Sequence, residues 1–326
     1  MTTRHRILRI LQDGRFHSGE TLGRQLGVSR AAVWKALRGL AEMGVAVDAV
    51  TGRGYRLTDP LELLDERLIT ETLSERARNL LSGLHLFEAT DSTNRFLMEQ
   101  GAAGAPCGSV CLAEAQQAGR GRRGRTWVSP FAGNLYLSVL WRFAGGPQAA
   151  QGLSLAVGVM AAQVLESLGV AEVKLKWPND LLWRGAKLGG ILVEMAGEAG
   201  GPCYVVVGIG INVRMPPGAG APIDQAWTDL HSAGCGATVS RNLLAATMID
   251  TLLCGLDAFG QTGLQSYLQP WRRLDALCEQ PVTVHTPGGA IDGEGVGIDE
   301  TGALRVRHAG GIRTFHAGDV SLRRRS

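Results

Sequence analysis

A run of arginines and glycines between Gln116 and Trp127, QQAGRGRRGRTW, has the composition of an anion-binding loop. Guanidinium groups form charge-assisted, often paired hydrogen bonds to phosphate oxygens, and glycines let a backbone close around a ligand. The run is not a P-loop, because the Gly-Lys-Ser/Thr ending is missing. From the residues alone, three interpretations remain open: a site for a phosphorylated small molecule, a contact with nucleic acid, or a solvated loop.

Three further polar groups could hold a ligand or do chemistry. The motif DSTN at 91–94 offers hydroxyls and an amide at an expected helix start, where free N–H groups also bind polar ligands. Lys187 precedes two glycines and a strand, and in a site it would act as a point charge for a phosphate. Asp180 follows Trp177-Pro178 in a turn and could accept a proton from an attacking amine. Each group also has an ordinary explanation, as a helix cap, a surface lysine or a turn residue.

Other kinds of site are not indicated. No Ser-His-Asp or Cys-His arrangement stands out among the seven histidines, and we predict no metal-ligand cluster. The closest cysteines, Cys107 and Cys111, form no CxxC pair, so neither a zinc site nor a disulfide framework is expected. GIGIN at 208–212 lacks the third glycine of a dinucleotide fingerprint. No apolar run reaches the roughly 18 residues that cross a bilayer, and we expect a cytoplasmic protein without membrane contact.

The first 60 residues predict a winged helix-turn-helix. RHRILRILQDG carries a helical apolar stripe that ends at Gly14. Ser18 and Ser29 are natural N-caps for two further helices, with a tight turn at Gly27 between them. The stretch VAVDAVTGRGYRL at 45–57 predicts two short strands around a turn, which would form the wing.

Charge favours DNA binding by this unit. Residues 1–59 contain ten Lys or Arg and five Asp or Glu, a net charge of +5 against +3 for the whole chain. Phosphate contacts require such a local excess. The alternative is a packing module that binds no DNA. The expected DNA contacts are Ser29, Arg30, Trp34, Lys35, Arg38 and Arg53.

Two more domains are expected after a polar, proline-containing linker that begins at residue 58. Residues 65–272 mix helices with hairpin-connected strands, including a strand over 134–143 and a buried helix over 148–168, which indicates an α+β domain. Residues 275–326 show short strands separated by glycine-rich turns, typical of a small β-barrel. The expected fold class is α+β, with domains at 1–60, 65–272 and 275–326.

The order of these motifs resembles the bacterial bifunctional biotin–protein ligases and biotin-operon repressors. The resemblance runs from about Arg6 to Leu322 and implies a central domain similar to class II aminoacyl-tRNA synthetases and an SH3-like C-terminal barrel. Each motif is modest alone, but their order beside a helix-turn-helix is highly specific. The motifs are DSTN (91–94), QQAGRGRRGR (116–125), KWPNDL (176–181), KLGGILVE (187–194) and GIGIN (208–212).

The resemblance also implies a two-step reaction. Biotin and ATP, with Mg²⁺, form biotinyl-5′-AMP and pyrophosphate, and a lysine of a biotin carboxyl carrier protein, such as that of acetyl-CoA carboxylase, then takes the biotin. The adenylate would also favour a homodimer that binds operator DNA. No tightly bound prosthetic group is expected.

The family's functional residues map onto the motifs of this chain. The implied catalytic residues are Lys187, Arg122 and Asp180. Biotin would contact Ser92, Thr93, Asn94, Gln116, Arg120, Gly121, Arg122 and Lys187. ATP or the adenylate would contact Arg120, Arg122, Arg123, Trp127, Lys187, Asn212 and Trp227. The segment 214–226 matches no motif of the family.

Three alternatives to the ligase remain. A ligand-sensing regulator would have a pocket but would release no pyrophosphate. A lipoate–protein ligase shares the fold, and the GRGRRGR loop and the winged helix favour biotin over lipoate. A nucleic-acid protein that uses the arginine loop directly would keep salt-sensitive binding without residues 1–60.

Overall fold

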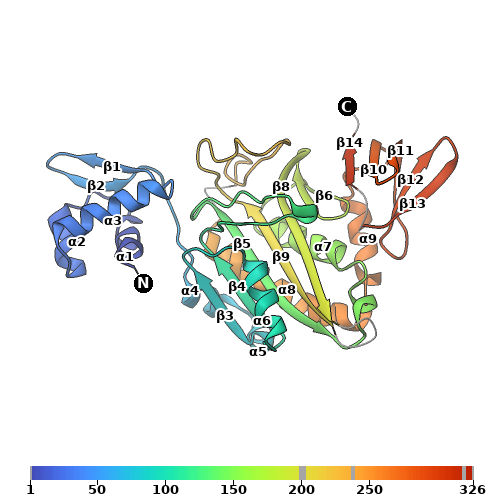
Figure 1. The fold of residues 1–326 in the computed structure, drawn as a ribbon, viewed down its shortest axis with the longest axis horizontal. Coiled ribbons are helices and arrows are strands. Elements are labelled where there is room, and N and C mark those ends of the chain that lie inside the picture. The colour runs from blue at the N-terminus through green and yellow to red at the C-terminus, as the bar shows by residue number, and fades with distance from the viewer. Residues whose placement is uncertain (1, 198–202, 236–238, 318–320, 325–326) are drawn as a thin grey trace.

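The computed structural model describes residues 2–197, 203–235, 239–317 and 321–324. Figure 1 shows three units along the molecule: the N-terminal unit at one end, a large unit of sheet and helices in the middle, and a small unit of strands at the other end. The α+β class predicted from the sequence is confirmed.

The N-terminal unit is the predicted winged helix-turn-helix. Ser18 and Ser29 cap the second and third helices by accepting hydrogen bonds from the N–H groups of Thr21 and Ala32. Gly27 ends the second helix with a φ of 67°, a left-handed conformation that favours glycine. The apolar stripes of the three helices meet in one core. The elements are α1 (Thr3–Leu11), α2 (Gly19–Leu26), α3 (Arg30–Glu42), β1 (Val47–Val50) and β2 (Gly54–Leu57).

An apolar cluster joins this unit to the middle of the molecule. Leu63, Phe131 and Ala132 are buried in the same cluster as the core of the winged helix. The ion pair between Arg4 and Glu88, 2.7 Å long, also links the two units. The winged helix is therefore packed against the central unit as well as tethered to it.

The linker predicted from residue 58 ends earlier than expected. The sequence TDPLELLDERLITETL at 58–73 predicts a polar linker, and this prediction is wrong from residue 66, where α4 (Glu66–Thr72) begins, followed by α5 (Glu75–Leu80). The side chain of Asp65 caps α4 by accepting from two backbone N–H groups, and Ile69 is fully buried. Both short helices pack against α8 (Arg241–Thr262).

A seven-stranded sheet forms the centre of the molecule, in the order β3-β4-β5-β9-β8-β7-β6. β3 and β4 are parallel, and the other neighbours are antiparallel. The hairpin-connected strands expected in this domain are confirmed, because β6, β7 and β8 pair antiparallel in sequence order. The strands are β3 (Gly83–Phe87), β4 (Ser109–Ala113), β5 (Asn134–Phe143), β6 (Val173–Lys176), β7 (Asp180–Trp183), β8 (Ala186–Gly197) and β9 (Cys203–Asn212).

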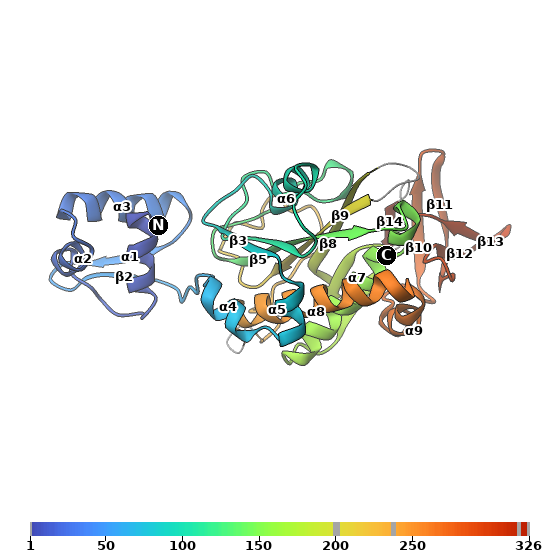
Figure 2. The same cartoon turned by 90° about the horizontal axis from the view of Figure 1, so that it is seen from below.

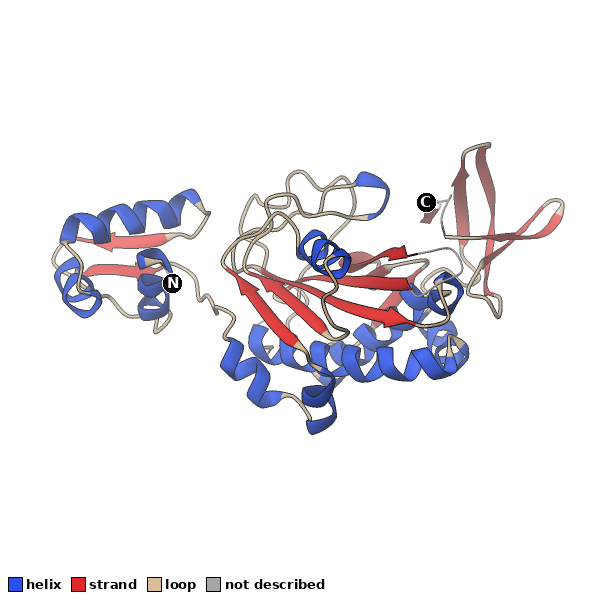
Figure 3. Cartoon of the chain, turned by 60° about the horizontal axis from the view of Figure 1, so that its bottom comes forward, coloured by secondary structure: helices blue, strands red, loops and turns tan. Residues whose placement is uncertain are grey.

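Helices cover both faces of this sheet. α6 (Thr93–Ala102) lies on one face, and α7 (Leu153–Ser167) and α8 lie on the other, as Figures 2 and 3 show. α8 and the segment 147–167, which includes α7, are long and apolar enough to cross a membrane by composition, yet 50% and 61% of their respective windows are buried inside the molecule. Their apolar character is accounted for by packing on the sheet.

The C-terminal unit consists of five antiparallel strands in the order β13-β12-β11-β10-β14, in agreement with the predicted small β domain. Trp177 Nε1 donates to the carbonyl oxygen of Gly302 at 3.1 Å and ties this unit to the KWPND segment. The remaining elements are η1 (Arg122–Gly124), η2 (Pro147–Ala150), α9 (Gln265–Leu274), β10 (Pro281–Thr286), β11 (Gly289–Ile298), β12 (Leu304–His308), β13 (Gly311–Phe315) and β14 (Ser321–Arg324).

Candidate active site

A cavity of about 700 Å³ opens between the arginine loop, the β7–β8 hairpin and the segment 222–227. Every residue predicted to take part in catalysis or to bind biotin or nucleotide lies in its wall. The structure thus brings together motifs that are far apart in the sequence. These residues are Ser92, Thr93, Asn94, Gln116, Arg120, Gly121, Arg122, Arg123, Trp127, Asp180, Lys187, Asn212 and Trp227.

Hydroxyl and amide groups gather where α6 begins. The side chain of Ser92 caps α6, and Thr93 and Asn94 are almost fully buried behind it. Gln116 Oε1 accepts from the N–H of Thr93 at 3.0 Å. Ser138, a buried residue of β5, lies 2.7 Å from Thr93 Oγ1 and 2.6 Å from Asn94 Oδ1. This part of the cavity can recognise a neutral, polar head group.

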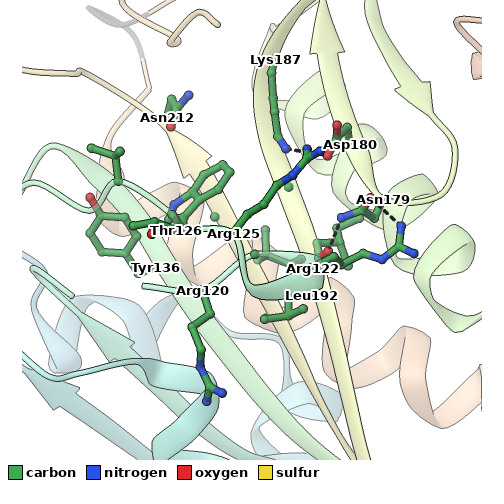
Figure 4. A pocket seen from close by; sticks show the side chains of 18 of the residues that line it. Arg120, Arg122, Arg125, Thr126, Tyr136, Asn179, Asp180, Lys187, Leu192 and Asn212 are labelled. Atoms are coloured by element: carbon green, nitrogen blue, oxygen red, sulfur yellow. Dashed lines mark hydrogen bonds and ion pairs between the residues drawn. The ribbon is translucent and has the colours of Figure 1, made fainter. Parts of the chain in front are cut away.

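A partly buried ion pair lies on another wall. Lys187 Nζ is 2.7 Å from Asp180 Oδ1, and the two side chains are 16% and 15% exposed, respectively. The ammonium also lies 5.5 Å from the ring centroid of Trp127. A lysine ammonium has three donors, so protons remain for an incoming anion. Figure 4 shows the two charged groups meeting within the cavity.

Arg122 is held by groups outside its own loop. Its Nη1 donates to Asn179 Oδ1 at 3.3 Å, drawn as a dashed line in Figure 4, and its Nη2 donates to the carbonyl of Ala317 in the C-terminal unit. Burial lowers the pKa of Arg122, and the nearby charge of Asp180 opposes that shift. A partly desolvated guanidinium gains more from a phosphate than a solvated one does.

Two glycines of the GIGIN motif make room for the site. A Cβ atom on Gly208 would lie 2.0 Å from Asn94 Oδ1, and one on Gly210 would lie 2.5 Å from the ring of Trp127. The strand β9 therefore runs directly under both side chains. This gives a structural reason for the glycines of a motif that the sequence analysis used for the family resemblance and rejected as a dinucleotide fingerprint.

The unassigned segment 214–226 supplies part of the cavity wall, at residues 222–225. Trp227 is placed by backbone hydrogen bonds on either side of it, from Lys187 N to the carbonyl of Ala226 at 3.0 Å and from Thr228 N to the carbonyl of Lys187 at 2.9 Å. Asn212 Nδ2 donates to the carbonyl of Thr228 at 2.9 Å, so Asn212 also anchors this segment. No sequence signal beyond its glycines and prolines marked it.

Sequence reasoning missed two further polar residues, Asn179 and Ser138. Asn179 lay within a quoted motif but was given no role, although its Nδ2 also donates to the carbonyl of Ile191 at 2.8 Å. Ser138 is the one polar residue inside the apolar part of NLYLSVLW. A polar residue at a buried strand position was the available signal for it.

The predicted DNA contacts lie apart from the cavity, exposed on α3 and the wing. Trp34 is 57% exposed, and the guanidinium of Arg38 lies 5.7 Å from its ring centroid. Arg53, at the wing turn, stacks on Phe16 at 4.2 Å. The hydroxyl oxygen of Ser29 is already used as the cap of α3.

Comparisons with known proteins agree with this architecture. Family models match as follows: "HTH domain" at residues 3–56, "Biotin/lipoate A/B protein ligase family" at 86–212 and "Biotin protein ligase C terminal domain" at 277–323. The biotin protein ligase from Aquifex aeolicus, solved in complex with biotin and ATP, is 27% identical with a TM-score of 0.64, over 75% of this chain and 100% of that chain.

Relatives that match almost the whole chain are bifunctional ligase/repressors. The chain is 44% identical over 317 residues to the bifunctional ligase/repressor BirA of Salmonella typhimurium, covering 97% of this chain and 96% of the relative. It is 42% identical over 318 residues to BirA of Escherichia coli, covering 98% of this chain and 96% of the relative. A DNA-binding fold joined to a biotin ligase fold defines a ligase that is also a repressor. The chain belongs to the family of bifunctional biotin ligase/repressors.

Proposed function

We propose that the cavity makes biotinyl-5′-AMP and presents it to a lysine of a biotin carboxyl carrier protein. The observation that carries this proposal is that the hydroxyl and amide cluster, the Lys187–Asp180 pair and the arginine loop line one cavity of about 700 Å³. A neutral head-group site beside a phosphate site suits an acyl adenylate.

In the first step, a carboxylate oxygen of biotin attacks the α-phosphorus of ATP. A new P–O bond forms, the bond between the α-phosphorus and the bridging oxygen breaks, and pyrophosphate leaves. Negative charge on the α-phosphate oxygens increases in the transition state, where Lys187 and Arg122 stabilise it. The Lys187 ammonium moves from Asp180 toward the phosphate or shares its protons with both.

In the second step, the amine of the acceptor lysine attacks the acyl carbon of the adenylate. The C–N bond forms, the acyl C–O bond breaks, and AMP leaves as the amine loses a proton. Asp180 is the carboxylate best placed to orient that amine, because it already binds one ammonium at 2.7 Å. Charge-assisted hydrogen bonds of this kind fix geometry well.

The arginine loop retains the intermediate. Its glycines let it close over the adenylate, and closure shields a mixed anhydride from water. Trp127 and Trp227 would line the nucleotide end. Arg120 now lies 3.5 Å from Glu194, so it would reorient when the phosphate enters.

Mg²⁺ would enter with ATP. In the described part of the chain, no group of three or more His, Cys, Asp or Glu is placed to hold a metal. Magnesium often binds through substrate phosphates, one or two carboxylates and waters, and Asp180 and Asp224 are carboxylates in the cavity wall. When bound, the ion would neutralise part of the triphosphate charge.

The test is biotin-dependent exchange of labelled pyrophosphate into ATP. The wild type should exchange, and Lys187→Ala should lose at least about 100-fold, the scale of removing one transition-state donor. Arg122→Gly should keep forming the adenylate but release it early. No exchange by the wild type would leave a ligand-sensing regulator as the better assignment, and competition by lipoate at equal concentration would favour lipoate ligation.

We further propose that the adenylate is the corepressor. Ordering of the loops would favour a two-fold dimer, whose two winged helices would span a two-fold operator. Arg30, Lys35, Arg38 and Arg53 would contact DNA. The six cysteines of the described chain form no disulfide, which suits a reducing cytoplasm. Equal operator affinity with and without biotin and ATP would contradict this part.

A further inference from the structure

The exposed face of α3 combines one large aromatic side chain with positive charge. Trp34 is 57% exposed, more than any other large hydrophobic side chain in the part of the chain that the structure describes. Arg30 and Arg38 stand four residues before and after it, and both are exposed as well. Residues four apart lie on one side of a helix. The opposite side of α3, with Val33 and Leu37, packs into the core of the winged helix.

Trp34 is oriented by Arg38 and is not part of the core. The guanidinium carbon of Arg38 lies over the indole ring, 5.7 Å from its centroid, in the geometry of a cation–π contact. The same guanidinium lies 3.9 Å from Glu42 at the end of α3, an exposed pair of little strength. More than half of the surface of Trp34 still faces solvent. Its apolar surface is therefore available to a ligand, and that ligand must also suit the charges on either side of the ring.

The charge of this face favours nucleic acid as the ligand. Residues 29–41 contain Arg30, Lys35 and Arg38 and no Asp or Glu. The major groove of B-form DNA is about 12 Å wide and admits an α-helix. A helix in the groove can reach phosphates with its charged flanks, whereas side chains at the centre of its exposed face meet the edges of the bases. Trp34, midway between two arginines, has the central position.

We infer that Trp34 determines sequence specificity by contacting the 5-methyl group of a thymine in the major groove. Among the groups that the four bases present there, the thymine methyl is the apolar one, and the others are hydrogen-bond donors and acceptors. The neighbouring cations attract phosphates of any sequence. The apolar ring therefore favours thymine over the other bases at one position of each half-site. This inference rests on the proposed function, in which two winged helices bind a two-fold operator.

The experiment removes single methyl groups from DNA. The full chain, with biotin, ATP and Mg²⁺, first selects its preferred duplex from a pool of random sequences. Each thymine of that duplex is then replaced by deoxyuridine, together with its symmetry mate in the other half-site. Deoxyuridine keeps the base pair and the O4 acceptor and lacks only the methyl group. Fluorescence anisotropy at one fixed salt concentration gives the dissociation constants, because affinity for DNA depends strongly on salt.

The wild type should bind about tenfold more weakly when one particular pair of thymines is replaced, the loss expected from removing two buried methyl groups. Trp34→Ala should bind the unmodified duplex about tenfold more weakly than the wild type does, for the same reason. The replacement should then cost this variant less than about twofold, because no ring remains to contact the methyl groups. Trp34→Phe keeps an apolar ring and should retain at least about a fivefold effect.

The decisive readout is whether the thymine effect disappears with the ring. A purely structural role of Trp34 would weaken binding of the thymine and deoxyuridine duplexes by the same factor. The inference is overturned if no replacement changes the wild-type affinity by more than about twofold, or if Trp34→Ala keeps the full thymine effect. Failure of the wild type to enrich any duplex would overturn the proposed binding of operator DNA, and this inference with it.

Lys35→Gln is the matched control, because it removes a charge from the neighbouring exposed position. It should weaken binding of both duplexes alike, with a shallower salt dependence, and its thymine effect should stay within about twofold of that of the wild type. If Lys35→Gln also abolished the thymine effect, general weakening and not loss of the ring would be responsible, and the inference would fail. Should Trp34→Ala not fold, Trp34→Gln supplies a polar side chain of good helix propensity and should lose the thymine effect in the same way.

Discussion

At the scale of single residues, the positions of two side chains in the cavity wall depend on how closely the backbone of β9 approaches them. Asn94 and Trp127 both lie against β9 where glycine leaves no Cβ. Two conservative substitutions on one strand, separated by one residue, should therefore damage different ends of the cavity. Each changes only a methyl group.

Gly208→Ala should weaken biotin binding by at least about tenfold, since the methyl group would lie 2.0 Å from Asn94 Oδ1 and displace an amide held on both sides. Gly210→Ala should instead raise the KM for ATP by a similar factor, because the ring of Trp127 must move from the nucleotide end. Core overpacking typically costs about 1–3 kcal/mol. Calorimetry with biotin and the ATP dependence of pyrophosphate exchange measure the two effects separately.

Gly83→Ala is the matched control, because nothing lies within 4 Å of its added Cβ. It should leave both parameters unchanged. If Gly208→Ala and Gly210→Ala affected biotin and ATP equally, the assignment of two distinct ends to the cavity would be wrong.

The motifs predicted a set of ligand-binding residues, and the structure places all of them in the wall of one cavity. The supporting residues were not predictable in the same way. Ser138 lies in an apolar strand, and its two short hydrogen bonds depend on the register of β5 beside α6. That register is a property of the folded sheet, so single-sequence patterns do not contain it.

At the scale of elements, local chemistry was a good guide where helices carry caps. Ser18, Gly27 and Ser29 bounded their helices as predicted, because capping depends on neighbouring atoms alone. The helix α4 was missed because its polar, exposed face resembles a linker. Packing against α8 stabilises the helix, and that packing is not visible in the local sequence.

The junction between α9 and the C-terminal strands predicts a pH effect. Burial raises the pKa of Asp275 from 3.8 to about 6, partly opposed by hydrogen bonds from the N–H groups of Leu277 and Cys278. Well below pH 3.8 the carboxyl is protonated in both the folded and the unfolded state. As the pH rises toward 6 the unfolded chain ionises first, so the folded state loses stability, and above 6 the loss is complete.

Asp275→Asn should therefore stabilise the protein at pH 7, by on the order of 1–3 kcal/mol for a shift of this size, and the gain should shrink at pH 4.5. Asparagine keeps an oxygen that can accept from Leu277 N, now at 2.9 Å. Urea unfolding at the two pH values measures the difference. A gain of equal size at both would show that the charge of Asp275 is not the cause.

At the scale of the whole molecule, one apolar cluster connects the segment that follows the arginine loop with the core of the winged helix. Phe131 follows the arginine loop by a few residues and is 5% exposed within the cluster that also holds the core of the winged helix. The chain between the units is fixed too, because Leu64 N donates to Glu114 Oε1 at 2.6 Å and Glu114 forms a buried ion pair with Arg241 at 2.8 Å. The winged helix is thus placed by buried contacts.

The buried apolar contacts and the surface ion pair differ in the free energy that each contributes. Truncating a buried phenylalanine costs about 3–5 kcal/mol, whereas a partly exposed ion pair such as Arg4–Glu88, at 36% and 22% exposure, contributes about 0–1 kcal/mol. Phe131→Ala should therefore speed proteolytic cleavage around residues 58–61 at least about tenfold, and Arg4→Ala by less than about threefold. Timed digestion with mass spectrometry measures both. Equal rates in the two variants would mean that the apolar cluster contributes no more than the surface ion pair to holding the winged helix against the ligase.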